Sequence, residues 1–335
     1  MLQNQRVCQL VRSKTGCEPL ALVVAWGART AGRCAAGVLG AVKHQRFSDQ
    51  QLETFAARAP GICPKPVCDA GEPCPLPPQD DAVDVSVIVP VHNGERFLRA
   101  CLDSILHQNT TRRLQVLAAQ ARTGADIVQG GWQYCDEADT CGAVQQYAEA
   151  CYTGPRRLDV VELPGTPWGK LYRRTLFERV RFPSGYTCFE DAMIHFWVFP
   201  RAKCIASTKP AVYLWRKNTM GLTATSQNTA KALQAYWVAE EMLDGAVRLG
   251  LPQDALFACN LILQLANYCY VCVAGLPEAD RQTAFACCCL LYRRWAAKLP
   301  DPRTLPYAVR LAQRALEQAD YGLWQLQGRL FQLIN

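Results

Sequence analysis

One stretch of the chain, DVSVIVPVHNGERFLRACLDSILHQ from Asp84 to Gln108, joins three local patterns in a fixed order. Val85 to Val91 is a nearly continuous β-branched run, which predicts a strand covered on both faces of an α/β sheet. Pro90 ends the pairing of that strand because proline has no N–H to donate, and His92-Asn93-Gly94 supplies turn chemistry. The sequence therefore predicts a buried strand that runs through a turn directly into a helix.

The predicted helix begins at Glu95, and its apolar residues recur at spacings of three and four. They are Phe97, Leu98, Cys101, Leu102, Ile105 and Leu106. Such a stripe is expected to pack on the sheet and to leave Arg96 and Arg99 in solvent. Strand, turn and helix together predict the first βα unit of a nucleotide-binding sheet, so the predicted fold class is α/β.

The same residues resemble the start of the family 2 glycosyltransferases, in which the end of the first strand holds the uracil and ribose of a sugar nucleotide. The resemblance implies a truncated GT-A sheet, of the nucleotide-diphospho-sugar transferase type. It also implies donor contacts from Pro90, Val91, His92, Asn93 and Glu95. The family more often has Tyr where His92 stands, and either ring can stack and hydrogen-bond. The alternative for these residues is a plain strand-ending turn.

Composition and charge limit the partners. Half of the 335 residues are apolar and 19% are charged, which is typical of a globular chain. The net charge is +7, and basic residues gather between Thr166 and Met220, as expected near a diphosphate or an acidic membrane surface. No nucleic-acid partner is predicted, because zinc-finger spacing and RNA-binding motifs are missing. Met1 to Lys14 has charges and no apolar centre, so the predicted location is cytoplasmic, with peripheral contact at the inner face of the membrane as a further option.

The 18 cysteines are dispersed, and reduced thiols explain them more simply than a disulfide scaffold does. Cys269 and Cys272 form a C-x-x-C inside an apolar helical pattern, so a structural role is expected. Cys287 to Cys289 are expected to be small core residues. His44, beside Lys43, is interpreted as a solvated helix residue and not as a ligand.

The segment Ala255–Pro277 has no charge and is long enough to span a bilayer. Its polar residues Asn260, Gln264 and Asn267 fall at spacings of four and three, which places them in one stripe of a helix. This pattern predicts a core helix of a soluble protein.

The chain divides by composition into four predicted parts. Residues 1–60 read as helical, with a capped helix after Ser48, and 61–83 form a proline-rich linker. Residues 84–224 form the glycosyltransferase-like domain, and 225–335 form a helical extension. Helices are expected in the extension over 229–249, 253–274, 278–298 and 306–334.

The glycosyltransferase-like domain looks internally shortened near residues 118–125. In the family a second strand, here Arg113–Ala118, runs into an Asp-Asp-Gly-Ser loop and later an Asp-x-Asp motif that holds Mg²⁺ or Mn²⁺. Neither motif is present, and Ala119–Gly124 leads straight to ADIVQGGW, which resembles a later family segment. No metal cofactor is therefore retained in the prediction, and Asp126 and Asp136 are the carboxylates that could replace the missing motif.

The short connection also conflicts with two parallel neighbouring strands, which need a crossover of about a dozen residues. Either residues 113–122 form a helix, which their Ala, Leu, Gln and Arg residues favour, or the strands pair in another order. After the following strand-like segment, Cys135–Arg157 is polar and is expected to be irregular.

A second resemblance begins at Pro164. Trp168 and Lys170 lie in a match to the family's Trp-x-Lys-Leu-Tyr-Arg segment, and Glu190-Asp191 matches its acidic pair at the head of a helix. The resemblance implies that Asp191, more than Glu190, takes the proton from the acceptor hydroxyl, since a carboxylate at a helix N-terminus stays ionised. Simple capping of helix 192–199 is the alternative. His195 is expected to lie in the core.

Tyr213 to Asn218 resembles the family's closing basic segment, which implies that Arg216 and Lys217, with Trp168 and Lys170, approach the donor diphosphate or the acceptor. The resemblance thus implies a glycosyltransferase that moves a sugar from a nucleotide-sugar donor to a polysaccharide or other cell-envelope acceptor, saccharide or lipid-linked. The alternatives are a catalytically inactive relative that serves as a binding or assembly module, and a non-functional deletion product.

Overall fold

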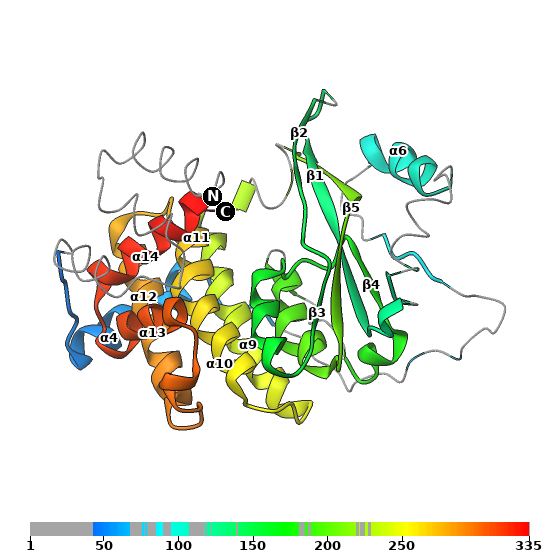
Figure 1. Ribbon diagram of the computed structural model, residues 1–335. Coiled ribbons are helices and arrows are strands. Elements are labelled where there is room, and N and C mark those ends of the chain that lie inside the picture. The colour runs from blue at the N-terminus through cyan, green and yellow to red at the C-terminus, as the bar shows by residue number, and fades with distance from the viewer. Residues whose placement is uncertain are drawn as a thin grey trace. The chain divides into compact units, whose positions relative to one another are not determined.

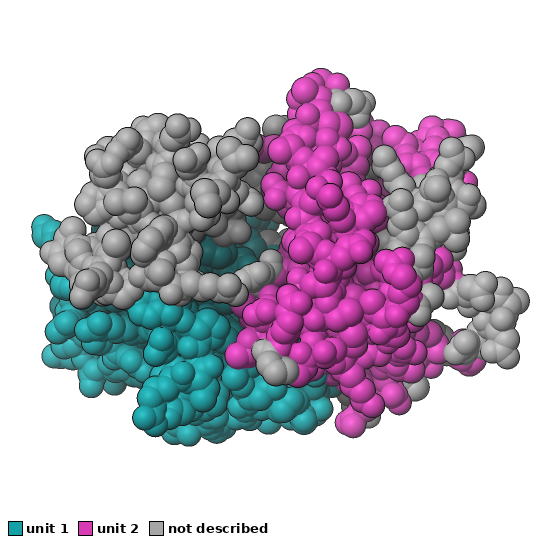
Figure 2. Space-filling view, viewed as in Figure 1, with its two compact units in different colours: residues 1–69, 183–200, 219–335 teal, residues 70–182, 201–218 magenta. Residues whose placement is uncertain are grey.

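The computed structural model describes residues 43–67, 85–89, 95–106, 122–138, 140–180, 189–218 and 229–334, with 76, 78, 117, 119–120, 185–186, 221 and 225–226. The chain divides into two compact units, coloured separately in Figure 2. Unit 1 comprises Met1–Asp69, Pro183–Pro200 and Thr219–Asn335, and unit 2 comprises Ala70–Phe182 and Arg201–Asn218. One five-stranded sheet and many helices make the architecture mixed α/β, as predicted.

Unit 2 is built on the sheet. Its strands are β1 (Ile127–Cys135), β2 (Cys141–Gln145), β3 (Ala150–Tyr152), β4 (Lys170–Tyr172) and β5 (Ile205–Arg216). The strand order is β2-β1-β5-β3, and β4 pairs with β1. The long strands β1 and β5 run parallel, side by side in Figure 1, and the other pairs are antiparallel. The first residues of β1 and β5 therefore lie at one end of the sheet, and their last residues lie at the opposite end.

Two glycines in the middle of β1 allow its neighbours to come close. A Cβ on Gly130 would overlap the side chain of Val212 in β5, and one on Gly131 would lie 2.8 Å from the carbonyl oxygen of Gln145 in β2. The register between β1 and β5 shifts at Gly131. Beside this point Val128 and Ala206 belong to the buried core of the sheet. Because only glycine fits here, the pair GG in ADIVQGGW is explained by packing.

The predicted first strand is wrong for the residues described. Val85–Val89 form no strand, and the side chain of Val87 is 55% exposed. A β-branched run becomes a strand only where a sheet edge pairs with it. β1 is paired on both sides by strands that follow it in the sequence, β2 and β4 on one side and β5 on the other, so Val85–Val89 are not the neighbour of β1 that the prediction requires. The rest of the predicted strand, Pro90 and Val91, lies outside the described residues.

The helix predicted from Glu95 is confirmed as α6 (Glu95–Leu106), but the burial of its apolar stripe is not. Phe97 is half-buried, whereas Leu102 is 43% exposed and Leu106 is exposed further. No residue of α6 is fully buried. The 3.6-residue period predicted the helix, but the strand that it was expected to cover does not form among the described residues.

The helical alternative for residues 113–122 is confirmed where that segment is described. Leu117, Ala119, Gln120 and Arg122 are helical, and Gly124 ends the turn with φ 62° while its N–H donates to the carbonyl of Gln120. The expectation of an irregular segment over 135–157 is wrong, because β2 and β3 form there, followed by η2 (Gly154–Glu162). Both strands are short. β2 forms a hairpin with β1, and β3 pairs with β5, which is distant in sequence, so their own residues gave little strand signal.

Unit 1 is helical. Its elements are α4 (Asp49–Ala56), α5 (Ala59–Ile62), η4 (Glu190–Ala192), η5 (Ile194–Val198), η7 (Ala230–Leu233), α9 (Gln234–Arg248), α10 (Ala255–Leu263), η8 (Gln264–Tyr268), α11 (Cys269–Val273), α12 (Glu278–Ala296), η9 (Pro302–Thr304), α13 (Tyr307–Glu317) and α14 (Tyr321–Ile334), and η6 (Phe199–Arg201) ends at the boundary with unit 2. The capped helix after Ser48 is confirmed, with a complete capping box to Gln51. The four helical segments of the C-terminal extension are confirmed, and the last is split into α13 and α14.

An aromatic core holds the helices of unit 1 together. The ring of Phe285 in α12 packs on Phe47, Tyr321 and Trp324, with centroid distances of 5.2 to 5.6 Å. The core role expected for Cys287 to Cys289 is confirmed, since all three are buried.

The interpretation of His44 as a solvated helix residue is right about solvent, since its side chain is 45% exposed, and wrong about the helix. It lies outside any helix, and its Nδ1 pairs with the buried carboxylate of Asp320 at the start of α14. This contact joins segments at opposite ends of the sequence, so no local pattern could indicate it.

Among the helical stretches described, Ala255–Val273 is the one whose length and apolar composition would allow it to cross a bilayer, and most of it is buried inside the unit. The polar residues Asn260 and Gln264 are buried with it, and Asn260 donates to the carbonyl of His195. Core helices commonly combine these properties.

Candidate functional site

Five aromatic side chains gather on one face of the sheet in unit 2. Trp132 and Tyr134 of β1 lie opposite Tyr213 and Trp215 of β5 in the register, and alternate residues of a strand point to the same face. Trp168, just before β4, stacks on Tyr213 with centroids 4.8 Å apart and planes 13° apart. It also meets Trp132 edge to face at 5.2 Å. We call these five residues the aromatic face.

The aromatic face is a continuous surface that is only partly covered. Tyr134 meets Trp132 at 4.6 Å and Trp215 at 4.7 Å, both edge to face. Tyr134 is 41% exposed and Tyr213 37% exposed, while the three tryptophans are half-buried. Desolvation raises the pKa of both tyrosine hydroxyls. At neutral pH these hydroxyls therefore stay protonated and can both donate and accept hydrogen bonds.

A braced turn presents Trp168 to the sheet. Gly169 has φ 68°, in the left-handed region that favours glycine, and its carbonyl accepts from the N–H of Gly130 at 2.9 Å. The ammonium of Lys170 donates to the carbonyl of Thr166 at 2.5 Å, and the hydroxyl of Tyr172 donates to the carbonyl of Pro167 at 3.1 Å. Lys170, expected at a diphosphate, thus holds the turn that carries Trp168.

The basic residues at the end of β5 lie beside α6. Arg216 donates to the carbonyl of Asp136 at 3.0 Å, and its guanidinium lies 5.4 Å from the ring centre of Phe97. Lys217 is held through its backbone N–H, which donates to the carbonyl of Cys135 at 2.8 Å, and its side chain is exposed. Glu95 is the exposed first residue of α6. Trp168, Lys170, Arg216 and Lys217 therefore belong to the same unit and surround one sheet.

The acidic pair belongs to the other unit. Glu190 and Asp191 lie in the short turn η4, and Asp191 is half-buried. Burial raises the pKa of the Tyr268 hydroxyl, and the negative charge of Asp191 raises it further. The core role expected for His195 is confirmed, because the ring is buried and lies 4.6 Å from Phe199.

Four of the expected donor contacts, Pro90, Val91, His92 and Asn93, lie outside the described residues. Of the two carboxylates considered as a replacement metal site, Asp136 accepts from the N–H groups of Ala138 and Thr140 and closes the turn after β1. Asp126 is also engaged, by Arg173 and by backbone N–H groups. In the ranges that the structure describes, no three His, Cys, Asp or Glu side chains lie close enough to share a metal ion.

The sequence contains a signal for the aromatic face that motif reading missed. Trp132-Gln133-Tyr134 and Tyr213-Leu214-Trp215 both alternate aromatic with other residues, which is the period of a strand with one aromatic side. Two such segments in one sheet give facing pairs if they are in register.

No protein-family model, no curated protein and no solved structure matches the chain. The resemblance to the family 2 glycosyltransferases therefore rests on the motifs of the chain alone.

Proposed function

We propose that the chain descends from the family 2 glycosyltransferases through loss of the segment with the metal motif, and that its aromatic face binds a saccharide. One observation supports this most directly. The ring of Trp168 stacks on Tyr213 at 4.8 Å, and these residues belong to the two separate stretches, 164–173 and 213–223, that resemble the family. Two family-like stretches far apart in sequence thus meet on one sheet, as a common ancestry with the GT-A sheet requires.

The chemistry of the face suits a sugar ring. The face of an aromatic ring carries a partial negative charge, and the C–H groups of a sugar carry a partial positive charge, so the two surfaces attract and exclude water together. The protonated hydroxyls of Tyr134 and Tyr213 add donors and acceptors at the edge. A partly exposed aromatic cluster rimmed by polar groups is also unusual for a surface without a ligand.

We place saccharide binding before sugar transfer, because the charged residues around the sheet are engaged within the protein. Lys170 and Arg216 both donate hydrogen bonds to backbone carbonyls within unit 2, and binding a diphosphate would compete with these bonds. Asp126 and Asp136 are likewise hydrogen-bonded within the unit. Stabilising a leaving nucleoside diphosphate normally requires a metal or several cations.

Transfer from a nucleotide-sugar donor to a cell-envelope acceptor is the second candidate, with Asp191 as the acceptor base. It is motivated by the match of Glu190-Asp191 to the acidic pair of the family and by the place of Asp191 in the helical turn η4.

The binding proposal is tested by calorimetric titration of the full chain with UDP, UDP-glucose and a cello-oligosaccharide. We expect saturable binding of a sugar-containing probe that weakens about tenfold or more in Trp168→Ala, because a stacking partner is lost. Tyr307→Ala, which removes a half-buried aromatic ring from unit 1, is the matched control and should bind as the parent does. Absence of saturable binding, or equal losses in both variants, would refute the proposal.

The transfer candidate is tested separately, by product formation from UDP-sugars with Mn²⁺ and the same oligosaccharide. If transfer occurs, Asp191→Asn should abolish it and leave saccharide binding unchanged, because an amide cannot take up a proton at neutral pH. Glu190→Gln should retain most of the transfer. Intact binding with no turnover in the parent chain would reject the enzyme and leave the binding module.

A further inference from the structure

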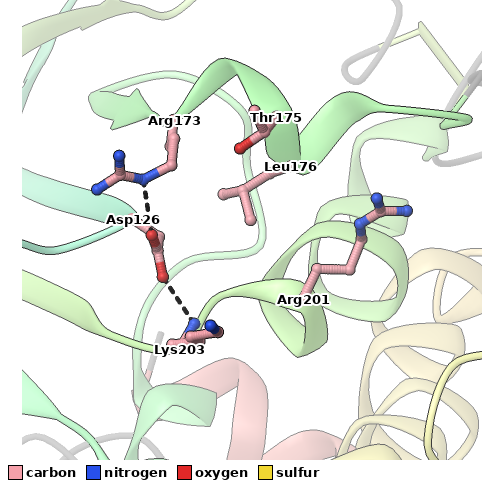
Figure 3. A pocket seen from close by; sticks show the side chains of 6 residues that line it. All are labelled: Asp126, Arg173, Thr175, Leu176, Arg201 and Lys203. Atoms are coloured by element: carbon pink, nitrogen blue, oxygen red, sulfur yellow. Dashed lines mark hydrogen bonds and ion pairs between the residues drawn. The ribbon is translucent and has the colours of Figure 1, made fainter. Parts of the chain in front are cut away.

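A pocket of about 380 Å³ lies at the end of the sheet where β1 and β5 begin. It is lined by Asp126, Arg173, Thr175, Leu176, Arg201 and Lys203 (Figure 3). Asp126 directly precedes β1, Lys203 precedes β5, and Arg173 follows β4, which runs antiparallel to β1. The volume is within the range of small-molecule sites, about 300–1,000 Å³. The aromatic face extends along the later parts of β1 and β5, so the pocket is a separate feature.

Among the described residues that line the pocket, the one carboxylate, Asp126, is fully hydrogen-bonded within the protein. Asp126 accepts from Nε of Arg173 at 2.8 Å through one oxygen, and from the backbone N–H groups of Lys203 at 2.7 Å and Cys204 at 3.2 Å through the other. Burial alone would raise the pKa of this carboxyl, but these hydrogen bonds and the charge of Arg173 outweigh burial and lower it. Asp126 therefore stays ionised and fixes the backbone that forms the pocket.

The cations of the pocket outnumber that carboxylate. Arg173 uses Nε for Asp126, which leaves its two terminal nitrogens for other partners. The side chains of Arg201 and Lys203 form no hydrogen bond or ion pair with the described part of the chain. In Figure 3 the Arg201 side chain lies across the opening from Arg173 and Asp126, with Lys203 below the Asp126 carboxylate. Three cations around one neutralised carboxylate leave a net positive charge in a concave site.

We infer that this pocket binds a phosphate or diphosphate group. The planar forks of Arg173 and Arg201 can each donate two parallel hydrogen bonds to phosphate oxygens, and Lys203 adds a point charge. Thr175 lies on the rim with a hydroxyl that can donate, and the buried side chain of Leu176 closes one wall. The concave shape strengthens the attraction for an anion, because low-dielectric walls focus the field of the cations.

The inference is tested by titrating the full chain with inorganic phosphate and with pyrophosphate, followed by ³¹P NMR and calorimetry at low salt. We expect saturable binding, tighter for pyrophosphate, that weakens about tenfold or more in Arg201→Gln and in Lys203→Gln, since each removes charged hydrogen-bond donors. Lys209→Gln removes an exposed lysine of β5 outside the pocket and should leave the affinity within about twofold. Thermal melts confirm that each variant is folded.

A second arm identifies the source of the phosphate. Sedimentation with phosphatidylcholine vesicles that contain phosphatidic acid is compared between the parent chain and Arg201→Gln. Vesicle binding that Arg201→Gln removes supports the inference and assigns the phosphate to a lipid headgroup. Pyrophosphate binding without vesicle binding supports the inference and assigns it to a soluble phosphorylated molecule. No saturable binding of either probe, or equal effects of Arg201→Gln and Lys209→Gln, would overturn it.

Discussion

Replacing Asp126 by Asn is expected to loosen the start of the sheet. One oxygen of this carboxylate holds Arg173 at the end of β4, and the other holds the N–H groups of Lys203 and Cys204 before β5. Asn has the same shape but one acceptor oxygen. If that oxygen keeps the two backbone N–H groups, the amide NH₂ faces Nε of Arg173, and two donors then meet.

The expected loss of unfolding free energy is about 1–3 kcal/mol. This is the usual range for a buried polar group that loses its partner. The ion-pair part of the loss is small, because nearly half of the Arg173 side chain is exposed and can turn to water. Asp136→Asn is the matched control: a single oxygen of Asp136 accepts from both Ala138 and Thr140, and an amide oxygen can replace it. This change should cost about 0.5 kcal/mol or less.

The effect of Asp126→Asn should depend on pH. The folded-state pKa of Asp126 lies below its unfolded value, so the stability that its charge contributes is fully present above the unfolded pKa, about 3.9, and is lost as the pH falls through the folded pKa. The difference in unfolding free energy between the parent and the variant should be constant from about pH 7 to 5 and should shrink below about pH 4.

Urea denaturation of both chains at several pH values between 7 and 2.5 measures this difference. A difference that persists unchanged at the lowest pH would refute the charge-based explanation, and so would a variant as stable as the parent at pH 7. A fall in the slope of the denaturation curve would show that the variant has changed the extent of the folded unit.

Two further predictions concern the helical unit. Asp320→Ala should cost about 2–4 kcal/mol, mainly because two backbone N–H groups, of Gln45 and Leu323, lose their acceptor, while the exposed His44 can turn to water. Asp280→Ala, at a more exposed pair, should cost about 1 kcal/mol or less. Chemical denaturation compares the two variants, and equal costs would contradict the role of Asp320. Gly245→Ala should destabilise by about 1–3 kcal/mol, because its Cβ would overlap the buried indole of Trp197. In the control Gly61→Ala the new Cβ meets no neighbour within 4 Å, so this change should be neutral or slightly stabilising. A higher melting temperature for Gly245→Ala would show that the indole can move aside.

Local patterns predicted the helices well, since helix signals are contained in neighbouring residues. The capping box at Ser48 needs only Gln51, three residues on, and the apolar period of α6 lies within one segment. The same reasoning predicted the helix and missed its burial, because burial of Leu102 depends on what lies opposite. Likewise the pair of His44 and Asp320 spans nearly the whole chain.

The strands were harder to predict than the helices, because a segment forms a strand only where it finds a pairing partner. Val85–Val91 has the strongest β-branched run in the chain and its described residues form no strand, whereas β2 (Cys141–Gln145) has a weak strand pattern and forms because it can pair with β1. The aromatic face depends on the register of β1 with β5, in which Trp132 lies opposite Tyr213. The phosphate pocket depends on polar residues at the starts of strands. The sequence singled out Asp126 only as a possible metal ligand and gave no signal for Lys203, because the motif search concerned the ends of strands.

The order of the sheet bears on which ancestral property the chain could keep. β1 obtains both of its neighbours from segments that follow it, β2 and β4 on one side and β5 on the other, and the described residues Val85–Val89 take no part in the sheet. In the proposed ancestry, that segment and the lost metal motif served the donor nucleotide. Trp132 and Tyr213, in contrast, lie on β1 and β5, the two long strands at the centre of the sheet, and the turn with Trp168 leads into β4. Loss of the donor-binding segments would therefore leave the aromatic face intact. For this reason the proposed function places saccharide binding before sugar transfer.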